Sequence, residues 1–264
     1  MSLLANETLT DNSATHQLKS CPPNFRPLRV VGVADVTPRM RRVTLSGPDL
    51  TRFDADEMHV KILIPRRGGE PVWPGVSPSG QAILDSCDLI RRTYTIRRVE
   101  LAAGTLDIDF VLHGETSPGS RFATRARPGD WLGIMGPAGI PNPAEGWQLI
   151  AGDETGLPVI GRTLERMRPD ERGLVLIEVA DAAEEQDIIR PPGVELRWLH
   201  RNGAAYGAKL AAAVRTAEWP EEETVSAWAA CETRAARAIR EHWGQERGLP
   251  ETHHRAVGYW RQEH

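Results

Sequence analysis

The sequence predicts two domains, a small antiparallel β-barrel followed by a parallel α/β domain. Three observations support this fold class. Short β-rich segments separated by turn residues fill positions 28–136, a pattern typical of an antiparallel barrel. Beyond position 147, apolar segments alternate with helical stretches, as they do in parallel β-α-β units. A stiff connector rich in proline, at 137–143, separates the two patterns.

The barrel is expected to contain six strands. We place them at 28–36, 40–46, 59–64, 93–99, 105–112 and 131–135, where β-rich segments are bounded by turn residues. The interval 65–84 is rich in Pro, Gly and Ser, so we expect a long surface loop there.

The α/β domain is expected to alternate four strands with three helices. The strands are predicted at 148–151, 174–179, 196–199 and 225–229, and the helices at 157–167, 205–216 and 233–248. We therefore divide the chain into a polar tail expected to be disordered (1–20), a barrel domain (21–139) and an α/β domain (140–264). Ligands of parallel sheets lie at the carboxyl ends of the strands, so we expect binding residues there.

Composition excludes several classes of function. The 264 residues are 40% hydrophobic and 26% charged, which is typical of a globular protein, and no apolar run approaches the roughly 20 residues that span a bilayer. The net charge of -4 and pI near 6.1 argue against a general nucleic-acid binder. The three widely spaced cysteines suit reduced thiols, and the histidines lack a metal-ligand spacing. We expect a cytoplasmic protein without a metal site.

The segment 91–97 alternates basic, aromatic and hydroxyl residues on a predicted strand. Arg92 and Tyr94 share a face because side chains two positions apart in an extended chain point the same way, whereas Thr95 lies on the other face. A flavin needs a cation for its pyrophosphate, an aromatic plane beside its ring and a small hydrogen-bonding group near its redox-active nitrogen. The segment offers all three, although an ordinary edge strand has a similar composition.

A second candidate element, at 113–123, follows a predicted strand and begins a helix. Gly119 and Ser120 at the helix start can present backbone N–H groups to a pyrophosphate, which the helix dipole also favours. The alternative is a Gly/Pro turn in which Ser120 only caps the helix.

Strand ends of the α/β domain supply further candidates. Gly152 and Gly156 permit close approach at a strand-to-helix turn. Asp181 follows the strand at 174–179 and can accept a ribose hydroxyl, which favours NADH, whereas His200 and Arg201 after the next strand can receive the 2′-phosphate of NADPH. The coenzyme preference therefore stays open.

Two residues near the end of the chain have competing interpretations. Cys231 lacks the partners of a catalytic triad, so we interpret it as a small residue that lines a nicotinamide pocket. Trp260 lies close to the C-terminal end of the sequence, where a terminal segment can fold back over a cofactor or form a last strand of the sheet.

Together these segments resemble the siderophore-interacting proteins, which are FAD-dependent ferric-siderophore reductases of the ferredoxin-reductase-like superfamily. The resemblance covers about 25–261 and is carried by 92–97, 113–123, 126–130, 152–158, 198–201 and 258–260. Each motif is weak alone, but the ordered set is specific.

The resemblance implies a flavin-binding barrel and a nicotinamide-binding α/β domain with FAD between them. It implies that Arg92 contacts the FAD pyrophosphate, that Tyr94 lies against the isoalloxazine and that Thr95 approaches its N5 atom. The other cofactor-binding residues that it implies are His113, Gly114, Gly119, Ser120, Asp153, Glu154, Thr155, Cys231, Glu232, Tyr259 and Trp260. For an anionic iron chelate it implies Lys61, Arg125, Arg255 and Arg261.

The activity that the resemblance implies is reduction of a ferric siderophore by NADH or NADPH through FAD, with release of ferrous iron. A nicotinamide delivers two electrons together and ferric iron accepts one, so a flavin must stand between them. No side chain is expected to act as an acid or base on the iron. Two alternatives stay open: a general NAD(P)H-flavin reductase or electron-transfer flavoprotein, and a siderophore-binding protein without redox activity. Nothing in the sequence demands more than a monomer.

Overall fold

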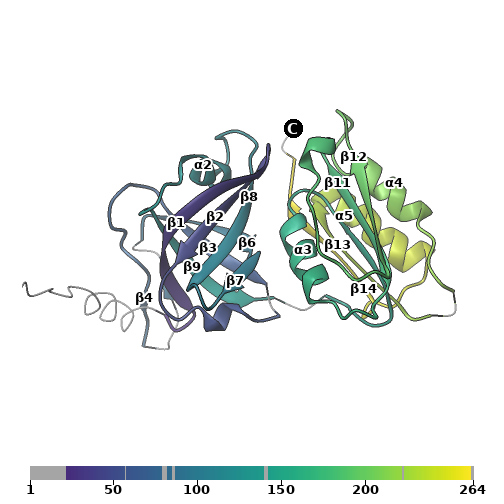
Figure 1. The fold of residues 1–264 in the computed structure, drawn as a ribbon, viewed down its shortest axis with the longest axis horizontal. Coiled ribbons are helices and arrows are strands. Elements are labelled where there is room, and N and C mark those ends of the chain that lie inside the picture. Colours follow the sequence, from purple (N-terminus) through teal and green to yellow (C-terminus); the bar gives the residue numbers. More distant parts are fainter. Residues whose placement is uncertain are drawn as a thin grey trace, which may run out of the picture.

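The computed structural model describes residues 22–56, 58–78, 82–84, 87–139, 142–221 and 223–262. It contains an antiparallel β domain followed by a parallel α/β domain, side by side (Figure 1), which confirms the predicted fold class. The predicted disordered tail, 1–20, lies outside the described residues. The predicted boundary between positions 139 and 140 stays a prediction.

The first domain is a seven-stranded sheet in the order β6-β3-β9-β1-β2-β8-β7. The strands are β1 (Phe25–Thr37), β2 (Met40–Ser46), β3 (His59–Pro65), β6 (Leu89–Thr95), β7 (Arg98–Glu100), β8 (Thr105–Val111) and β9 (Trp131–Ala138), with η1 (Thr51–Phe53) after β2. A small separate pair, β4 (Gly75–Val76) and β5 (Ala82–Ile83), lies within the predicted long loop. Helix α2 (Pro118–Arg125) lies at one end of the barrel (Figure 1).

The strand predicted at 93–99 is wrong in its extent. Strand β6 begins at Leu89 and ends at Thr95, which pairs with His59 of β3. The chain then changes partner, because the amide of Arg97 donates to the carbonyl of Asp107 in β8 and β7 continues along that strand. Ile96 at this corner is fully buried in the barrel core. Strands β6 and β7 form the two opposite edges of the sheet, so the segment has to divide where the chain crosses from one edge to the other.

The second domain is a five-stranded parallel sheet in the order β12-β11-β10-β13-β14. Its strands are β10 (Trp147–Gly152), β11 (Gly173–Val179), β12 (Val194–His200), β13 (Val225–Glu232) and β14 (His254–Trp260). The helices are α3 (Leu157–Arg166), α4 (Ala208–Thr216) and α5 (Thr233–Glu241), with η2 (Ala182–Glu184) and the π-helical turn η3 (His242–Glu246). Helix α3 covers the face toward the barrel, and α4 and α5 cover the other (Figure 1).

The predicted helix at 205–216 begins at Ala208, and the one at 233–248 is α-helical only to Glu241. The four predicted strands are present, each with slightly wider bounds. Strand β14 settles the position of Trp260: it pairs in parallel with β13 and brings the last described residues to the carboxyl edge of the sheet.

The two domains are joined by α3 and by the β1–β2 hairpin. Arg162 of α3 is 3% exposed and donates to the carbonyls of Ile96, Phe53 and Ala55 in the barrel, at 2.9, 3.2 and 3.0 Å. On the hairpin, Thr37 donates its hydroxyl to Glu184 of η2 at 2.6 Å. These contacts hold the carboxyl edge of the parallel sheet against the barrel.

Candidate functional site

The segment predicted to hold a flavin lies on β6 at the point where the barrel sheet meets α2. The Tyr94 ring packs on Phe110 of β8 with centroids 4.5 Å apart. A Cβ atom at Gly119 would lie 2.0 Å from the Tyr94 hydroxyl, so only glycine permits the ring to rest on the helix start. Arg92 is exposed, and its guanidinium donates to the carbonyl of Arg91 at 2.8 Å.

Tyr94 keeps its proton at neutral pH. Burial raises the pKa of Tyr94 to about 12, and the positive charge of Arg92 opposes that shift. The opposition indicates that the guanidinium and the phenol share one neighbourhood, as their two-residue spacing predicts. Tyr94 therefore offers a neutral ring and a hydroxyl donor beside an exposed cation.

The turn before α2 is held by its own side chains. Ser120 donates its hydroxyl to the carbonyl of Gly114 at 2.5 Å and accepts from the amide of His113 at 3.1 Å. Ser117 caps the helix: its hydroxyl accepts a hydrogen bond from the amide of Ser120 at 3.3 Å and is hydrogen-bonded to the His113 ring. The hydrogen bonds of His113, Gly114 and Ser120 thus fix the turn. Of the predicted residues here, Gly119 is the one left to meet an anion at the helix start.

This donor set fits FAD. An exposed guanidinium and a half-buried aromatic ring, which rests on a glycine at a helix start, lie together, and they match the pyrophosphate and ring of a flavin. Thr95 is buried at the end of β6, next to the domain boundary.

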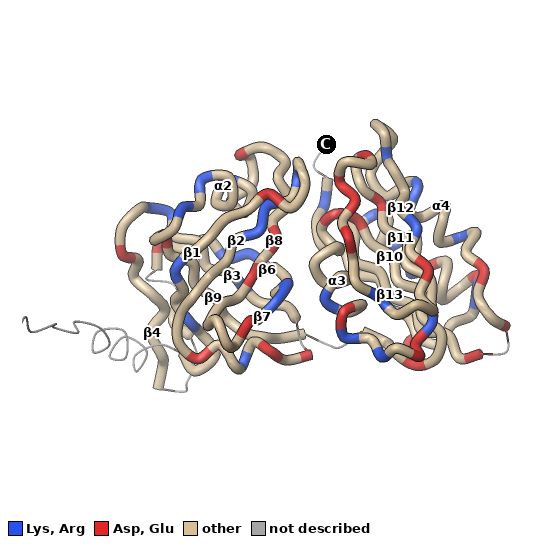
Figure 2. The backbone as a smooth tube through the Cα atoms, in the orientation of Figure 1, with Lys and Arg blue, Asp and Glu red and all other residues tan. Residues whose placement is uncertain are grey.

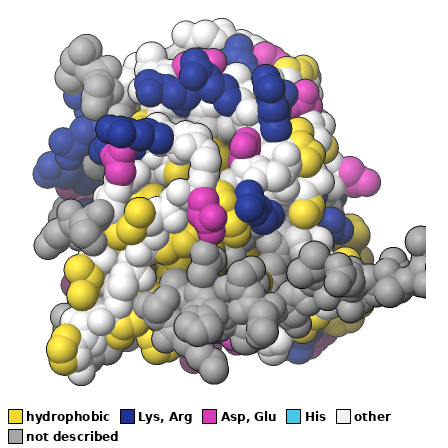
Figure 3. Space-filling view, turned by 90° about the vertical axis from the view of Figure 1, so that its left-hand side faces the viewer, with side chains coloured by type: hydrophobic (Ala, Val, Ile, Leu, Met, Phe, Trp, Pro, Cys, Tyr) yellow, Lys and Arg dark blue, Asp and Glu magenta, His cyan; other side chains and the backbone are white. Residues whose placement is uncertain are grey.

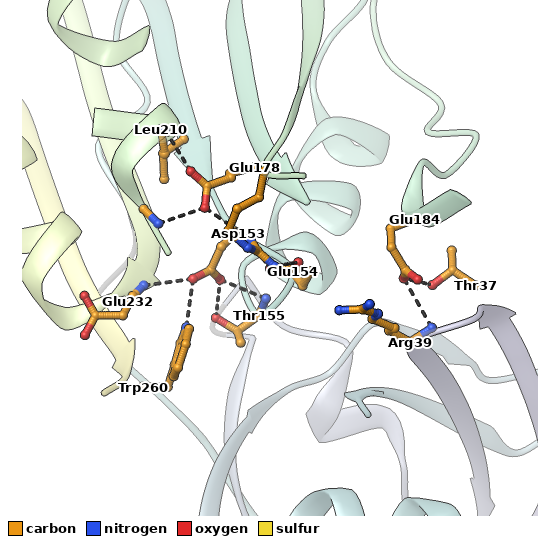
Figure 4. Close-up of polar contacts among 12 residues, drawn as sticks. Thr37, Arg39, Asp153, Glu154, Thr155, Glu178, Glu184, Leu210, Glu232 and Trp260 are labelled. Atoms are coloured by element: carbon orange, nitrogen blue, oxygen red, sulfur yellow. Dashed lines mark hydrogen bonds and ion pairs between the residues drawn. The ribbon is translucent and has the colours of Figure 1, made fainter. Parts of the chain in front are cut away.

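Asp153, at the end of β10, gathers four donors although it is 1% exposed. One carboxylate oxygen accepts from the amide and hydroxyl of Thr155 at 2.9 and 2.6 Å, and the other accepts from the Trp260 indole and the Glu232 amide, both at 2.8 Å (Figure 4). Burial raises the pKa of Asp153 to about 6, against the hydrogen bonds that favour the charge. Asp153 therefore joins the ends of β10, β13 and β14.

Glu232 uses its carboxylate as the cap of α5. It accepts from the amides of Arg234 and Ala235 at 2.6 and 3.2 Å. Cys231, beside it, is fully buried in the core against α4 and α5, and burial raises its pKa. The thiol is a packed core group in this arrangement, which argues against a nucleophile; a role beside a nicotinamide stays a prediction.

The surroundings of Arg201 argue against its interpretation as a ligand of the NADPH 2′-phosphate. It is 5% exposed, and its guanidinium donates to Glu154 at 2.6 Å and to Glu178 at 3.1 Å. The Tyr206 ring lies over it at 4.1 Å and meets the Trp260 ring edge-on at 4.9 Å. Two buried carboxylates already neutralise this cation, and Glu154 is committed to the same pair.

A cluster at the domain boundary brings the two halves of the site together. The Tyr259 hydroxyl of β14 is hydrogen-bonded to Nε2 of His59 on β3. Burial lowers the pKa of His59, and the charges of Arg255 and Lys61 lower it further. Lys61 itself donates to the hydroxyl of Thr93. The structure thus brings Lys61 and Arg255, from different domains, toward one neutral histidine.

The remaining predicted chelate ligands lie elsewhere. Arg125 on α2 pairs with Glu115, and Arg261 is exposed beyond β14. Figure 3 shows Lys and Arg side chains gathered along the upper edge of the barrel face turned away from the α/β domain, the edge on which α2 lies in Figure 1. Helix α2 contributes exposed Arg121 and Arg125.

Sequence analysis missed two residues that the fold brings to the site. His59 contacts a residue 200 positions away, a proximity that no local pattern signals. Arg39, at the β1–β2 hairpin, donates its amide to Glu184, and its exposed side chain points toward the end of β10 that carries Glu154 and Thr155 (Figure 4). The only signal available for it was a basic residue between the strands predicted at 28–36 and 40–46.

Two findings apply to the described residues only. Among them, no group of three or more His, Cys, Asp or Glu side chains is arranged to hold a metal ion. None of their helices has both the length and the apolar character needed to cross a membrane.

Comparisons with known proteins show which family the chain belongs to. Residues 29–140 match the model of the siderophore-interacting FAD-binding domain, and residues 145–263 match that of the siderophore-interacting protein. The ferric vibriobactin reductase ViuB of Vibrio cholerae is 32% identical over 86% of this chain and 85% of its own. The NADPH-dependent ferric-chelate reductase of Escherichia coli is 30% identical over 71% of this chain and 76% of its own.

A solved structure extends the likeness to the whole fold. The siderophore utilization protein from T. fusca is 40% identical, with a TM-score of 0.82 over 93% of this chain and 95% of its own. The identity and coverage of these relatives, with family models matched in both domains, decide the family. This chain belongs to the siderophore-interacting protein family.

Proposed function

We propose that this protein is an FAD-dependent NAD(P)H:ferric-siderophore reductase. One observation carries the proposal: the flavin-type site on β6 and α2 and the carboxyl edge of the parallel sheet meet at the contact between His59 and Tyr259. A dinucleotide at that edge and a flavin on the barrel would lie next to each other, as hydride transfer requires. Relatives named as ferric vibriobactin reductase and ferric-chelate reductase support the substrate class.

FAD, when bound, supplies the chemistry that accepts a hydride and releases electrons one at a time. The residues of this chain would hold and orient the flavin and the coenzyme. Arg92 and the Gly119 helix start would hold the pyrophosphate, and Tyr94 would lie along the flavin ring. Asp153 fixes the ends of three strands where the coenzyme would bind.

The iron is substrate, so its recognition rests on charge. Lys61 and Arg255 would face an anionic chelate from the two domains, since both lie close enough to His59 to lower its pKa. Arg125 is proposed as a weaker contributor because it lies on α2 and pairs with Glu115, whereas Arg261 directly follows Tyr259 and Trp260 at the end of β14. Each NAD(P)H reduces two ferric ions, since one hydride carries two electrons and each ferric ion takes one.

Gly119→Ala is expected to weaken flavin binding by at least about tenfold, because the new Cβ atom would displace the Tyr94 ring on which the site is built. The ratio of flavin to protein absorbance after purification and dilution measures this. Gly68→Ala is the matched control, since nothing lies within 4 Å of its Cβ position. Equal flavin retention by the two variants would rule out the proposed placement of FAD.

Lys61→Gln is expected to raise the KM for a ferric siderophore several-fold while the rate of flavin reduction by NAD(P)H stays unchanged. Stopped-flow spectroscopy separates the two half-reactions. Arg98→Gln is the control, since Arg98 lies on β7 and pairs with Asp107. A loss of flavin reduction in Lys61→Gln, with an unchanged KM for the chelate, would contradict the substrate role.

We also propose a cytoplasmic monomer that does not bind nucleic acid. The net charge of -4 supports the last point. Size-exclusion chromatography with light scattering tests the monomer, which a particle mass near twice 29.2 kDa would contradict.

A further inference from the structure

The ends of β11 and β12 decide which dinucleotide the α/β domain accepts. In parallel sheets of this kind, an acidic residue after the second strand binds the ribose 2′-hydroxyl of NADH, whereas a nearby arginine accommodates the 2′-phosphate of NADPH. Here β11 is followed by Asp181 and β12 by Arg201. The amides of Arg201 and Asn202 donate to the carbonyls of Val179 and Ala180 at 2.8 and 2.9 Å, so the two ends lie side by side.

Arg201 is withdrawn from this surface. Its guanidinium is held by Glu154 and Glu178, and Glu178 is fully buried and also accepts from the amides of Gly207 and Leu210. Tyr206 covers the guanidinium from the exposed side. To reach a 2′-phosphate, Arg201 would have to leave two carboxylates behind, buried and uncompensated.

The other groups at these strand ends already have hydrogen-bond partners. His200 is bonded to Glu185 through Nε2 at 2.6 Å, and Lys209 donates to the carbonyl of His200. Asp181 accepts from the amide of Ala183 through one carboxylate oxygen at 2.9 Å, which leaves the second oxygen outside that bond. Figure 2 shows acidic residues among basic ones at the upper end of the α/β domain.

We infer that this protein uses NADH in preference to NADPH, with Asp181 as the specificity-determining residue that accepts the ribose 2′-hydroxyl. The inference rests on the proposed function. A 2′-phosphate would bring close to two further negative charges against Asp181. Arg39 points toward Glu154 and Thr155 (Figure 4), which follow the first strand of the sheet, where domains of this kind bind the pyrophosphate that NADH and NADPH share.

The test compares kcat/KM for NADH and NADPH in anaerobic reduction of the FAD-loaded protein. The wild type is expected to favour NADH by at least about tenfold. Asp181→Asn keeps an acceptor for the Ala183 amide but removes the charge, and it is expected to shrink the ratio at least about threefold. Asp170→Asn, an exposed acid that precedes β11 at the opposite end of the sheet, should leave the ratio unchanged.

Equal or better use of NADPH by the wild type overturns this inference alone, because flavin reduction would still be observed. An unchanged ratio in Asp181→Asn overturns the assignment of Asp181. Reduction by neither coenzyme overturns both the inference and the proposed reductase activity.

Discussion

Arg201→Met is expected to lower the free energy of unfolding by about 3–5 kcal/mol. The substitution keeps an unbranched side chain but leaves Glu154 and Glu178 buried without a cation. Removing one partner of a buried ion network destabilises the protein by far more than the network itself stabilises it. The remaining charges have given up their hydration on burial and no longer have an opposite charge beside them. The cation stack with Tyr206, at 4.1 Å, is lost as well.

Urea unfolding followed by circular dichroism measures this loss. Arg197→Met is the matched control, since Arg197 lies on β12, the strand that precedes Arg201, is 53% exposed and pairs across the surface with Glu195. We expect that control to change stability by less than about 1 kcal/mol. A free energy of unfolding for Arg201→Met within the same range would show that the buried network does not hold the sheet edge together.

Arg162→Met is expected to destabilise the protein by about 2–4 kcal/mol and to slow flavin reduction by NADH. Arg162 serves three barrel carbonyls, those of Ile96, Phe53 and Ala55, and methionine would leave them without this donor at the domain boundary. Burial lowers the pKa of Arg162 to about 10, with the neighbouring charge of Arg166 acting in the same direction, so the guanidinium is still charged at neutral pH. The hydride donor and the flavin are held by different domains, so a looser boundary must lower the reduction rate.

Thermal or urea unfolding and stopped-flow flavin reduction measure the two effects together. Arg168→Met is the control, because Arg168 follows the same helix but is 72% exposed and pairs with Asp170 and Glu171. Wild-type stability and reduction rate in Arg162→Met would contradict the claim that this residue joins the domains.

The fold was predictable because its signals are local. Alternating β-rich segments with turns, and apolar segments with helices, locate most strands and helices of both domains to within a few residues, although the helix predicted at 233–248 is α-helical only to Glu241. The prediction of a strand at 93–99 failed because Arg97 follows β8 while Thr95 follows β3. Which partner a strand takes depends on residues far away in the sequence, so the division could not be predicted.

The residues of the candidate site also fall into a predictable and an unpredictable group. Arg92, Tyr94 and Gly119 were predictable because each carries its chemistry in a short motif, and the structure brings them together. The state of Arg201 was not predictable, because its two carboxylate partners lie 47 and 23 positions away and their burial depends on the packed sheet. His59 and Tyr259 meet for the same reason.

The most direct test of the proposed function is an anaerobic absorbance titration of the FAD-loaded wild-type protein, first with NADH and then with a ferric siderophore. The proposed activity predicts that NADH bleaches the flavin and that the ferric siderophore restores the oxidised spectrum, with two ferric ions consumed for each flavin. A flavin that NADH bleaches but that the ferric siderophore does not reoxidise would contradict it.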